Sequence, residues 1–251
     1  MAQQRTKGVD SARRALEILL HFSQNRPELT IDDIVTAAKV SLPSAYRYIS
    51  LLREMYLIEE RSKGVYVLSP EILQLAQAAE LTMDYRAQAQ PVLDQVCART
   101  GETALYLRRL NDAAVCLAMA ESDHAITISF QPGHVMPLHS GAGAKVLLSA
   151  LPKAKRSKYL ASLEPPLGSA ALELRNLDLD QIRASGFAVS QGEVDEGVWA
   201  CAAAVRSRGQ VVGALSVVAP GYRVTEVKHG AIAQIVRDAA EQLGSAIAGT
   251  R

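Results

Sequence analysis

The first 70 residues carry local patterns in an order that few small domains share. Three short segments with apolar residues three and four apart precede two runs of β-forming residues, which flank a turn containing Gly64. The three segments span residues 12–23, 30–38 and 41–55, and the two runs span 57–61 and 65–68. A pair of helices alone is common in helical bundles. Three helices followed by a hairpin predict a winged helix-turn-helix over residues 1–70.

Local signals mark where these helices begin. Thr30 and Asp33 have the spacing of a capping box, in which two side chains satisfy backbone amides at a helix start. Ser41 is an expected N-cap, and Pro43 stands in the first turn, where its missing N–H has no cost. The expected buried residues are Ala12, Ala15, Leu16, Leu19 and Leu20, then Ile34, Val35, Ala37 and Ala38, then Ala45, Tyr48, Ile49, Leu52 and Met55.

The pattern changes after the hairpin. A helix beginning at Pro70 runs into polar residues and predicts a linker over 71–87, and a second helix ends near Gly101. Strand-length segments then prevail, at 103–109, 113–121, 125–130, 135–139, 187–190, 198–206 and 211–218. Helices are expected at 145–151 and from about 225, with a polar loop after the first of these. The pattern predicts an α+β domain over 88–251, an antiparallel sheet with helices on one face.

The net charge limits the ways in which such a chain can bind nucleic acid. Lys and Arg number 27 against 26 Asp and Glu, a formal net charge of +1. This balance excludes a histone-like protein and any binding driven mainly by bulk charge. Up to Leu68 ten basic residues face eight acidic ones, a small excess. We therefore expect DNA binding that is oriented, dependent on oligomers and strongly dependent on salt.

The remaining composition predicts a cytoplasmic protein with no membrane partner. The longest apolar stretches, such as 211–219, are far shorter than the ~18 residues of a membrane helix. The N-terminal residues are polar and include no secretory apolar region. The three cysteines, Cys97, Cys116 and Cys201, are widely spaced and predict reduced thiols, without a disulfide or a zinc site.

Catalytic and cofactor chemistry has little support in the sequence. His139 beside Ser140, with Glu193 and Asp195, offers an acid–base arrangement, but no nucleophile elbow or Ser/Cys–His motif accompanies it. The five histidines have no metal-ligand spacing. We expect a protein that is not an enzyme and that holds no metal or cofactor.

Six blocks carry a family resemblance: SARRALEILLHF, VSLPSAYRYISLL, LIEERSKGVYVLSP, PVLDQVCARTGETALYLRRL, FQPGHVMPLHSGAGAKVLLSAL and GFAVSQGEVDEGVWACAAAV. Through them nearly the whole chain resembles the IclR family of bacterial transcriptional regulators. The resemblance implies a C-terminal effector-binding domain of GAF- or profilin-like fold joined to the winged helix. It also implies double-stranded operator DNA as partner, a small-molecule effector, and a homodimer or homotetramer.

The chain departs from the family pattern at four places. Tyr56 replaces a glycine at the turn into the wing, and 42–44 reads Leu-Pro-Ser where Lys-Ser-Thr is common. In the second domain Trp199-Ala200 replaces a frequent Arg-Cys or Arg-Ser pair, and Ser190 replaces an acid. These last positions border the family's effector pocket, so the ligand class does not transfer.

The expected DNA contacts lie on the third helix and the wing. The polar face of that helix carries Ser44, Arg47 and Ser50, with Tyr46 to one side, and the wing carries Arg61 and Lys63. Arg47 suits a guanine edge or a phosphate. The alternative for Arg47 is a solvated charge, and for Tyr46 packing against the wing.

The expected ligand contacts come from three places in the second domain. Ser140, Gly141 and Ala142 precede a helix whose free amides attract an anion such as a carboxylate. The resemblance puts Ser216 on the pocket floor, with Ser190 and Trp199 beside it. Trp199 there indicates an apolar, aromatic-binding pocket. The alternatives are glycines that allow close helix–sheet packing and a tryptophan that packs in the core.

We therefore expect a DNA-binding transcriptional regulator controlled by an effector, an organic acid or aromatic catabolite. Two alternatives stay open: a C-terminal domain that only oligomerises, and an enzyme domain carrying a winged-helix module. The sequence leaves open the effector, the operator, activation or repression, and dimer or tetramer.

Overall fold

A computed structural model describes residues 9–23, 26–81, 84–124, 130–163, 165 and 168–249. The chain divides into two compact units, residues 1–83 and 84–251, and the division falls within the expected linker. Each unit has its own hydrophobic core. None of the helices in the described parts is long and apolar enough to cross a membrane.

The N-terminal unit is a winged helix-turn-helix, as predicted. Helices α1 (Asp10–Leu19), α2 (Ile31–Ala38) and α3 (Leu42–Glu54) precede strands β2 (Ile58–Ser62) and β3 (Val65–Leu68), and α4 (Glu71–Leu81) follows. Strand β1 (Glu28–Thr30) pairs antiparallel with β3, giving the sheet order β1-β3-β2. Strand β1 was not predicted, because three residues are too few to show a strand period.

The predicted helix starts are present. The Asp33 amide donates to Thr30 Oγ1 at 3.2 Å and the Thr30 amide donates to Asp33 Oδ2 at 2.8 Å, which completes the capping box. Hydrogen bonds from Thr30 lower the pKa of the Asp33 carboxyl. Tyr56, the position of the family's glycine, has a φ of 56°. The backbone there keeps the left-handed conformation that glycine favours.

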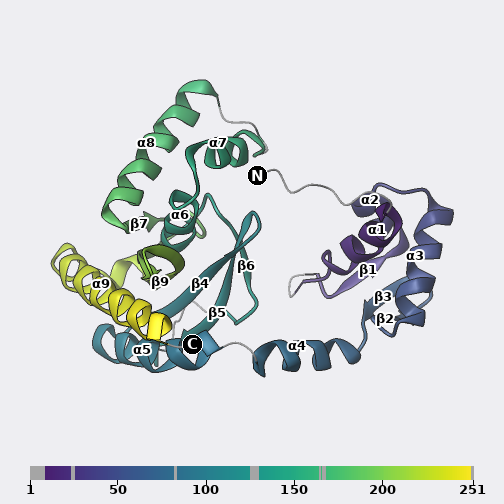
Figure 1. Cartoon of the computed structure of the whole chain (residues 1–251), viewed down its shortest axis with the longest axis horizontal. Helices are drawn as coiled ribbons and strands as arrows, with labels where there is room; N and C mark the ends of the chain where they lie inside the picture. The colour runs from purple at the N-terminus through teal and green to yellow at the C-terminus, as the bar shows by residue number, and fades with distance from the viewer. Residues whose placement is uncertain are drawn as a thin grey trace. The chain divides into compact units, whose positions relative to one another are not determined.

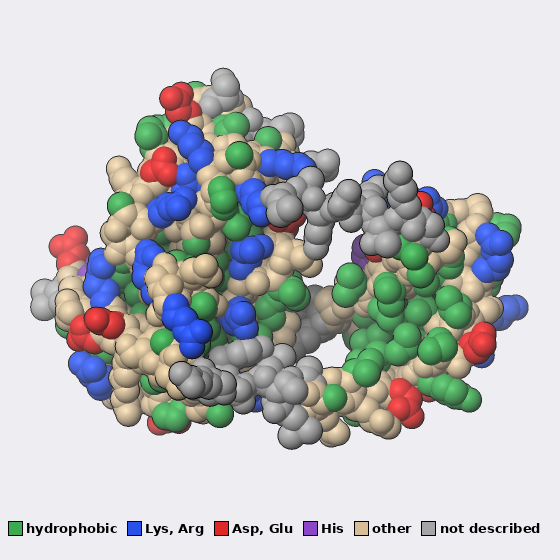
Figure 2. All heavy atoms as spheres, in the orientation of Figure 1, with side chains coloured by type: hydrophobic (Ala, Val, Ile, Leu, Met, Phe, Trp, Pro, Cys, Tyr) green, Lys and Arg blue, Asp and Glu red, His purple; other side chains and the backbone are tan. Residues whose placement is uncertain are grey.

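The apolar face predicted for α1 is wrong in part. Ala15 and Ile18 are buried, whereas Leu16 is 56% and Leu20 82% exposed. Met55, expected in the core below α3, is 60% exposed. The helix ends at Leu19, so Leu20 does not continue its face. Figure 2 shows hydrophobic side chains gathered on the surface of this unit.

The C-terminal unit is built on a six-stranded antiparallel sheet of order β6-β5-β4-β9-β8-β7. Its strands are β4 (Thr103–Leu110), β5 (Ala113–Ala120), β6 (Val135–Pro137), β7 (Phe187–Gln191), β8 (Val198–Ser207) and β9 (Gln210–Pro220). Its helices are α5 (Asp84–Thr100), α6 (Ala142–Ser149), α7 (Lys153–Ala161), α8 (Ser169–Ser185), the short η1 (Gly221–Arg223) and α9 (Glu226–Gly249).

Most of the strands agree with the prediction, whereas the polar loop predicted between α6 and β7 does not. The segment expected at 125–130 lies outside the described residues except for Phe130. The stretch after α6, predicted as a polar loop, contains α7 and α8. Helix α8 was not predicted, because it buries few apolar side chains, among them Leu179 and Ile182, and exposes Leu174 and Leu177.

Helices cover both faces of the sheet, so the prediction of helices on one face is wrong. Helices α5 and α9 pack on one face, where Tyr106, Cys201 and Leu215 point. Helices α6, α7 and α8 lie on the other (Figure 1), where Leu107 and Ala202 point. A strand buried on both faces reads as a continuous apolar run, as 199–205 does, and carries no alternation that reveals a solvent face.

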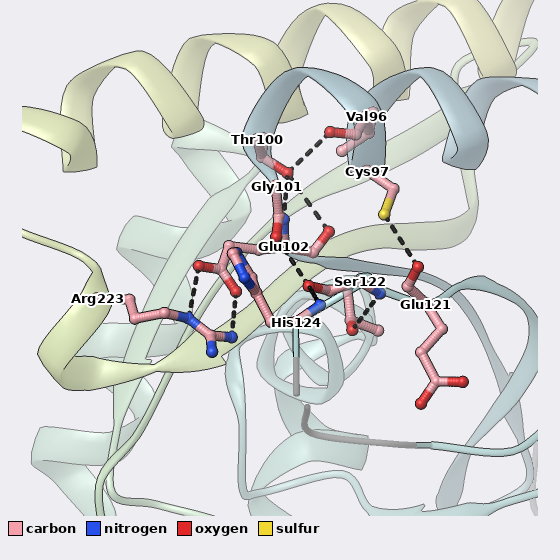
Figure 3. A network of polar contacts seen from close by, with 10 residues as sticks. Val96, Cys97, Thr100, Gly101, Glu102, Glu121, Ser122, His124 and Arg223 are labelled. Atoms are coloured by element: carbon pink, nitrogen blue, oxygen red, sulfur yellow. Dashed lines mark hydrogen bonds and ion pairs between the residues drawn. The ribbon is translucent and has the colours of Figure 1, made fainter. Parts of the chain in front are cut away.

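A polar network joins the residues that follow α5 to η1 and to the segment after β5 (Figure 3). Arg223 of η1 donates to both carboxylate oxygens of Glu102, at 3.0 and 2.7 Å. The Ser122 hydroxyl donates to the Gly101 carbonyl at 2.9 Å. Glu102 is only 7% exposed, so the bidentate guanidinium satisfies a carboxylate that burial would otherwise destabilise.

We expect Cys116 and Cys201 to be chemically inert in the folded protein. Burial raises the pKa of both thiols to about 12, so the thiolate fraction at pH 8 is on the order of 10⁻⁴. Mass spectrometry after iodoacetamide treatment should find both unmodified in native protein and alkylated in guanidinium. Cys97 serves as the accessible reference, because it is partly exposed even though burial also raises the pKa of its thiol. Rapid alkylation of Cys201 in native protein would contradict the burial of this thiol in the core.

Candidate functional site

The exposed face of α3 presents the residues expected to meet DNA. Tyr46, Arg47 and Ser50 are exposed, and Ser44 is half-buried, opposite the core face of the helix. The Arg47 guanidinium donates to the Ser44 hydroxyl at 3.3 Å and, among the described residues, pairs with no carboxylate. Arg47 therefore presents an uncompensated positive charge to solvent.

The two basic residues of the wing, Arg61 and Lys63, differ in their surroundings. The Arg61 guanidinium forms an ion pair with Glu28 of β1, while Lys63 is exposed at the hairpin turn. Tyr46 lies close enough to β3 to influence Tyr66, whose pKa is raised first by burial and then by the nearby Glu60 and Tyr46. The position of Tyr46 is thus compatible with both alternatives, contact with DNA and packing against the wing.

Glu60 was not among the residues predicted from the sequence, and it makes two contacts at the wing. One carboxylate oxygen accepts from the Gly64 amide at 2.9 Å, and the other lies 3.2 Å from Nη1 of Arg53 on α3. Glu60 thereby ties the wing turn to the end of the recognition helix. The only sequence signal was an acid four residues before the turn glycine.

The C-terminal unit contains a small cavity between the sheet and the start of α6. Its volume is about 30 Å³, which is room for one or two water molecules. Five of the six predicted ligand residues line it: Ser140, Gly141, Ala142, Ser190 and Ser216. Most other lining residues are apolar: Leu105, Leu107, Phe130, Met136, Gly143, Ala144, Val194, Val198, Ala200 and Val218. Glu193 also lines the cavity and, among the described residues, is its one acidic lining residue.

The polar groups at the start of α6 are engaged by neighbouring strands and loops. The Ala142 amide donates to the Ser190 hydroxyl at 3.0 Å, and the Gly141 amide donates to Glu193 Oε2 at 3.0 Å. On the cavity floor the Ser216 hydroxyl donates to the Cys201 carbonyl at 2.9 Å. An anion already occupies the helix start, and it is a side chain of the protein itself.

Lys145 completes this charged group and was also missed. Its side chain is 8% exposed, and its ammonium donates to Glu193 Oε1 at 2.5 Å and to the Val189 carbonyl at 3.0 Å. A lysine in an otherwise apolar helix was the available signal, because a buried charge needs a partner. The partner lies 48 residues away in the chain.

The prediction that Trp199 lines the pocket is wrong. Its indole lies on the opposite side of the sheet, stacked on His229 of α9 with ring centroids 5.0 Å apart, and it is 2% exposed. Successive side chains of a strand point to opposite faces, so Ala200 takes the position at the cavity. The tryptophan is a core residue, and the expected aromatic wall is replaced by a small methyl group.

The residues considered for catalysis are used otherwise. The Ser140 hydroxyl donates to the Glu193 carbonyl at 2.6 Å, while His139 Nδ1 lies 2.9 Å from the Tyr159 hydroxyl. Burial lowers the pKa of His139. Within the described ranges, Ser140 and His139 share no hydrogen bond, and no group of three His, Cys, Asp or Glu is arranged to hold a metal.

Comparison with known proteins agrees with this two-part architecture. Residues 11–62 match the family model of the IclR helix-turn-helix domain, and residues 77–245 match that of the bacterial transcriptional regulator IclR C-terminal domain. The HTH-type transcriptional regulator KipR of Bacillus subtilis is 27% identical over 250 residues, with 98% of each chain covered. The probable transcriptional regulator SauR of Cupriavidus necator is 29% identical over 221 residues, covering 86% of this chain and 88% of SauR.

Solved structures share the fold. A putative IclR transcriptional regulator from Silicibacter sp. TM1040 has a TM-score of 0.83 at 24% identity, covering 96% of this chain and 97% of that one. An IclR homolog from Microbacterium hydrocarbonoxydans, complexed with 4-hydroxybenzoate, has a TM-score of 0.73 at 21% identity, covering 96% and 100%. With family models matching both units, the chain belongs to the IclR family of bacterial transcriptional regulators.

Proposed function

We propose that this regulator binds a pseudo-palindromic operator through α3 and the wing, and that an organic acid or aromatic catabolite bound beside α6 controls this binding. The observation that carries the proposal is the cavity, which gathers five predicted ligand residues from distant parts of the chain. Arg47, which pairs with no carboxylate in the described part of the chain, is exposed on α3 and supports the DNA-binding part.

A homo-oligomer is the form in which we propose that it binds. Leu16 and Leu20 at α1 and Leu73 and Leu75 on α4 are each more than half exposed. Large apolar side chains exposed on a small unit are sites that another molecule can cover. A second copy of the same unit would cover some of these side chains and bring a second α3 to the adjacent half-site of the operator.

An aromatic or aliphatic carboxylate is the ligand class that suits the cavity. Leu105, Leu107 and Met136 supply an apolar lining, and the start of α6 with Lys145 supplies positive charge. One structural relative, from Microbacterium hydrocarbonoxydans, is complexed with 4-hydroxybenzoate. A cavity of about 30 Å³ must enlarge before it can hold such a molecule.

Two measurements test the proposal. Fluorescence anisotropy should show that the protein binds the DNA upstream of its own gene more tightly than unrelated DNA. The affinity should fall steeply as the salt concentration rises. A thermal-shift panel of small carboxylates should contain a compound that, at ~100 times its Kd, adds ~2.7 kcal/mol to the free energy of unfolding. Binding that shows neither sequence preference nor salt dependence would contradict the DNA-binding part.

The small size of the cavity favours a second candidate, in which the C-terminal unit only oligomerises and no ligand enters. This candidate predicts intact operator binding and no stabilising compound in the panel. A compound that both stabilises the protein and shifts operator affinity excludes it.

A further inference from the structure

We propose that Glu193 is a latch that holds the cavity closed, and that an anionic effector opens it by replacing the Glu193 carboxylate on Lys145 and on the Gly141 amide. The inference rests on the proposed function, in which this cavity receives the effector. The inference adds to the proposed function the residue that closes the site and the charge that the ligand must carry.

One wall of the cavity consists of exposed residues and belongs to the loop 192–197 between β7 and β8. Glycines with φ values of 64° and 77° stand near its two ends, at Gly192 and Gly197. Val194 of this loop packs so closely over Gly141 that a Cβ added there would lie 3.0 Å from its Cγ2. The strands and α6 that form other walls are buried, so the loop is the wall best suited to move.

Glu193 makes the three contacts that hold this loop over the cavity. Its carbonyl accepts from the Ser140 hydroxyl at 2.6 Å, and its carboxylate accepts from the Gly141 amide at 3.0 Å and from Lys145 Nζ at 2.5 Å. All three partners belong to the start of α6 or the residues just before it. The loop therefore closes on the same amide and ammonium groups that an anionic ligand would use.

The burial of Lys145 sets which ligands can open the latch. Its side chain is 8% exposed. Removing the carboxylate partner of a buried ammonium strongly destabilises the folded protein. An incoming carboxylate restores the pair, whereas a neutral ligand leaves Lys145 with the Val189 carbonyl alone. The displaced Glu193, already 26% exposed, regains full hydration. Anion binding and loop release are thus one exchange reaction.

Hydrogen exchange of the full-length protein, without any ligand, tests the latch itself. In the Glu193→Ala variant, amide exchange of Gly141 and of residues 192–197 should accelerate by about tenfold or more, because the variant lacks a charge-assisted hydrogen bond. Glu196→Ala, which removes an acid of the same loop, is the matched control and should leave Gly141 unchanged. Unchanged Gly141 exchange in folded Glu193→Ala protein overturns the latch.

Calorimetry with benzoate and its neutral analogue benzamide tests the exchange. Benzoate should bind the Glu193→Ala variant about tenfold or more tightly than wild type, while benzamide binding changes little. The double variant Lys145→Met/Glu193→Ala leaves no buried charge unpaired, which guards against misfolding, and should lose the preference for benzoate. An equal gain for both probes, or no benzoate binding to Glu193→Ala, overturns the exchange.

Operator binding separates this inference from the proposed function. If benzoate binds as expected but alters the operator affinity of none of the variants, the latch stands and the proposed regulation fails. If Gly141 exchange is unchanged but carboxylates still shift operator affinity, the regulation stands and the latch fails.

Discussion

Replacing Arg47 by alanine is expected to weaken operator binding by about a hundredfold or more. A bidentate arginine–guanine contact is worth ~1–3 kcal/mol of discrimination, and a dimer would lack two of them. Arg47 is exposed on α3, held only by the Ser44 hydroxyl at 3.3 Å, and bears no ion pair within the described part of the chain. Fluorescence anisotropy with the upstream duplex and with a scrambled duplex measures the decrease in affinity.

Lys63→Ala provides the comparison, because Lys63 at the wing turn is expected to bind a phosphate. This variant should weaken binding to both duplexes by the same factor and reduce the salt slope by about one for each phosphate that it no longer neutralises. Equal decreases on both duplexes for Arg47→Ala would reassign Arg47 to a phosphate. An Arg47→Ala protein with unchanged affinity would mean that this arginine is a solvated charge.

The second large effect is on stability and concerns two glycines of one helix. Gly244→Ala should lower the free energy of unfolding by about 3 kcal/mol, whereas Gly230→Ala should raise it by up to ~1 kcal/mol. A Cβ at Gly244 would lie 2.2 Å from the carbonyl oxygen of Arg206 in β8, so α9 or the strand must shift. At Gly230 a Cβ meets nothing within 4 Å, and alanine has the higher helix propensity.

Urea unfolding of the two variants and the wild type, followed by far-UV circular dichroism, measures both changes. The pair is internally controlled, because the same methyl group is added to the same helix at positions that differ only in their surroundings. Two shifts of the same sign would show that α9 does not approach the backbone of β8 closely at Gly244.

The parts of the molecule that were predictable from the sequence depend on neighbours within a few residues. The capping box of Thr30 and Asp33, the first-turn Pro43 and the hairpin turn at Gly64 each act over one turn of chain. Together they account for the winged helix, and the family resemblance accounts for the second fold. Strand β1 and helix α8 lacked comparably strong local signals and were missed.

The candidate site was predictable only as a set of segments. The start of α6, Ser190 and Ser216 were predicted to contact a ligand, and one cavity brings these residues together. The pair of Lys145 and Glu193 was not, because the two residues lie on segments 48 positions apart that meet only when β7 packs beside α6. No pattern within either segment identifies the other as its partner.

The sequence alone predicted the ends of α3 and of the two wing strands to within one residue, and it predicted that a strand-rich unit follows. Tertiary structure decided which face of the sheet each side chain occupies. The run 199–205 is apolar throughout because helices cover both faces, so its period of two cannot show which residues meet the cavity. The packing of α6 on one side and α9 on the other placed Ala200 at the cavity and Trp199 against His229.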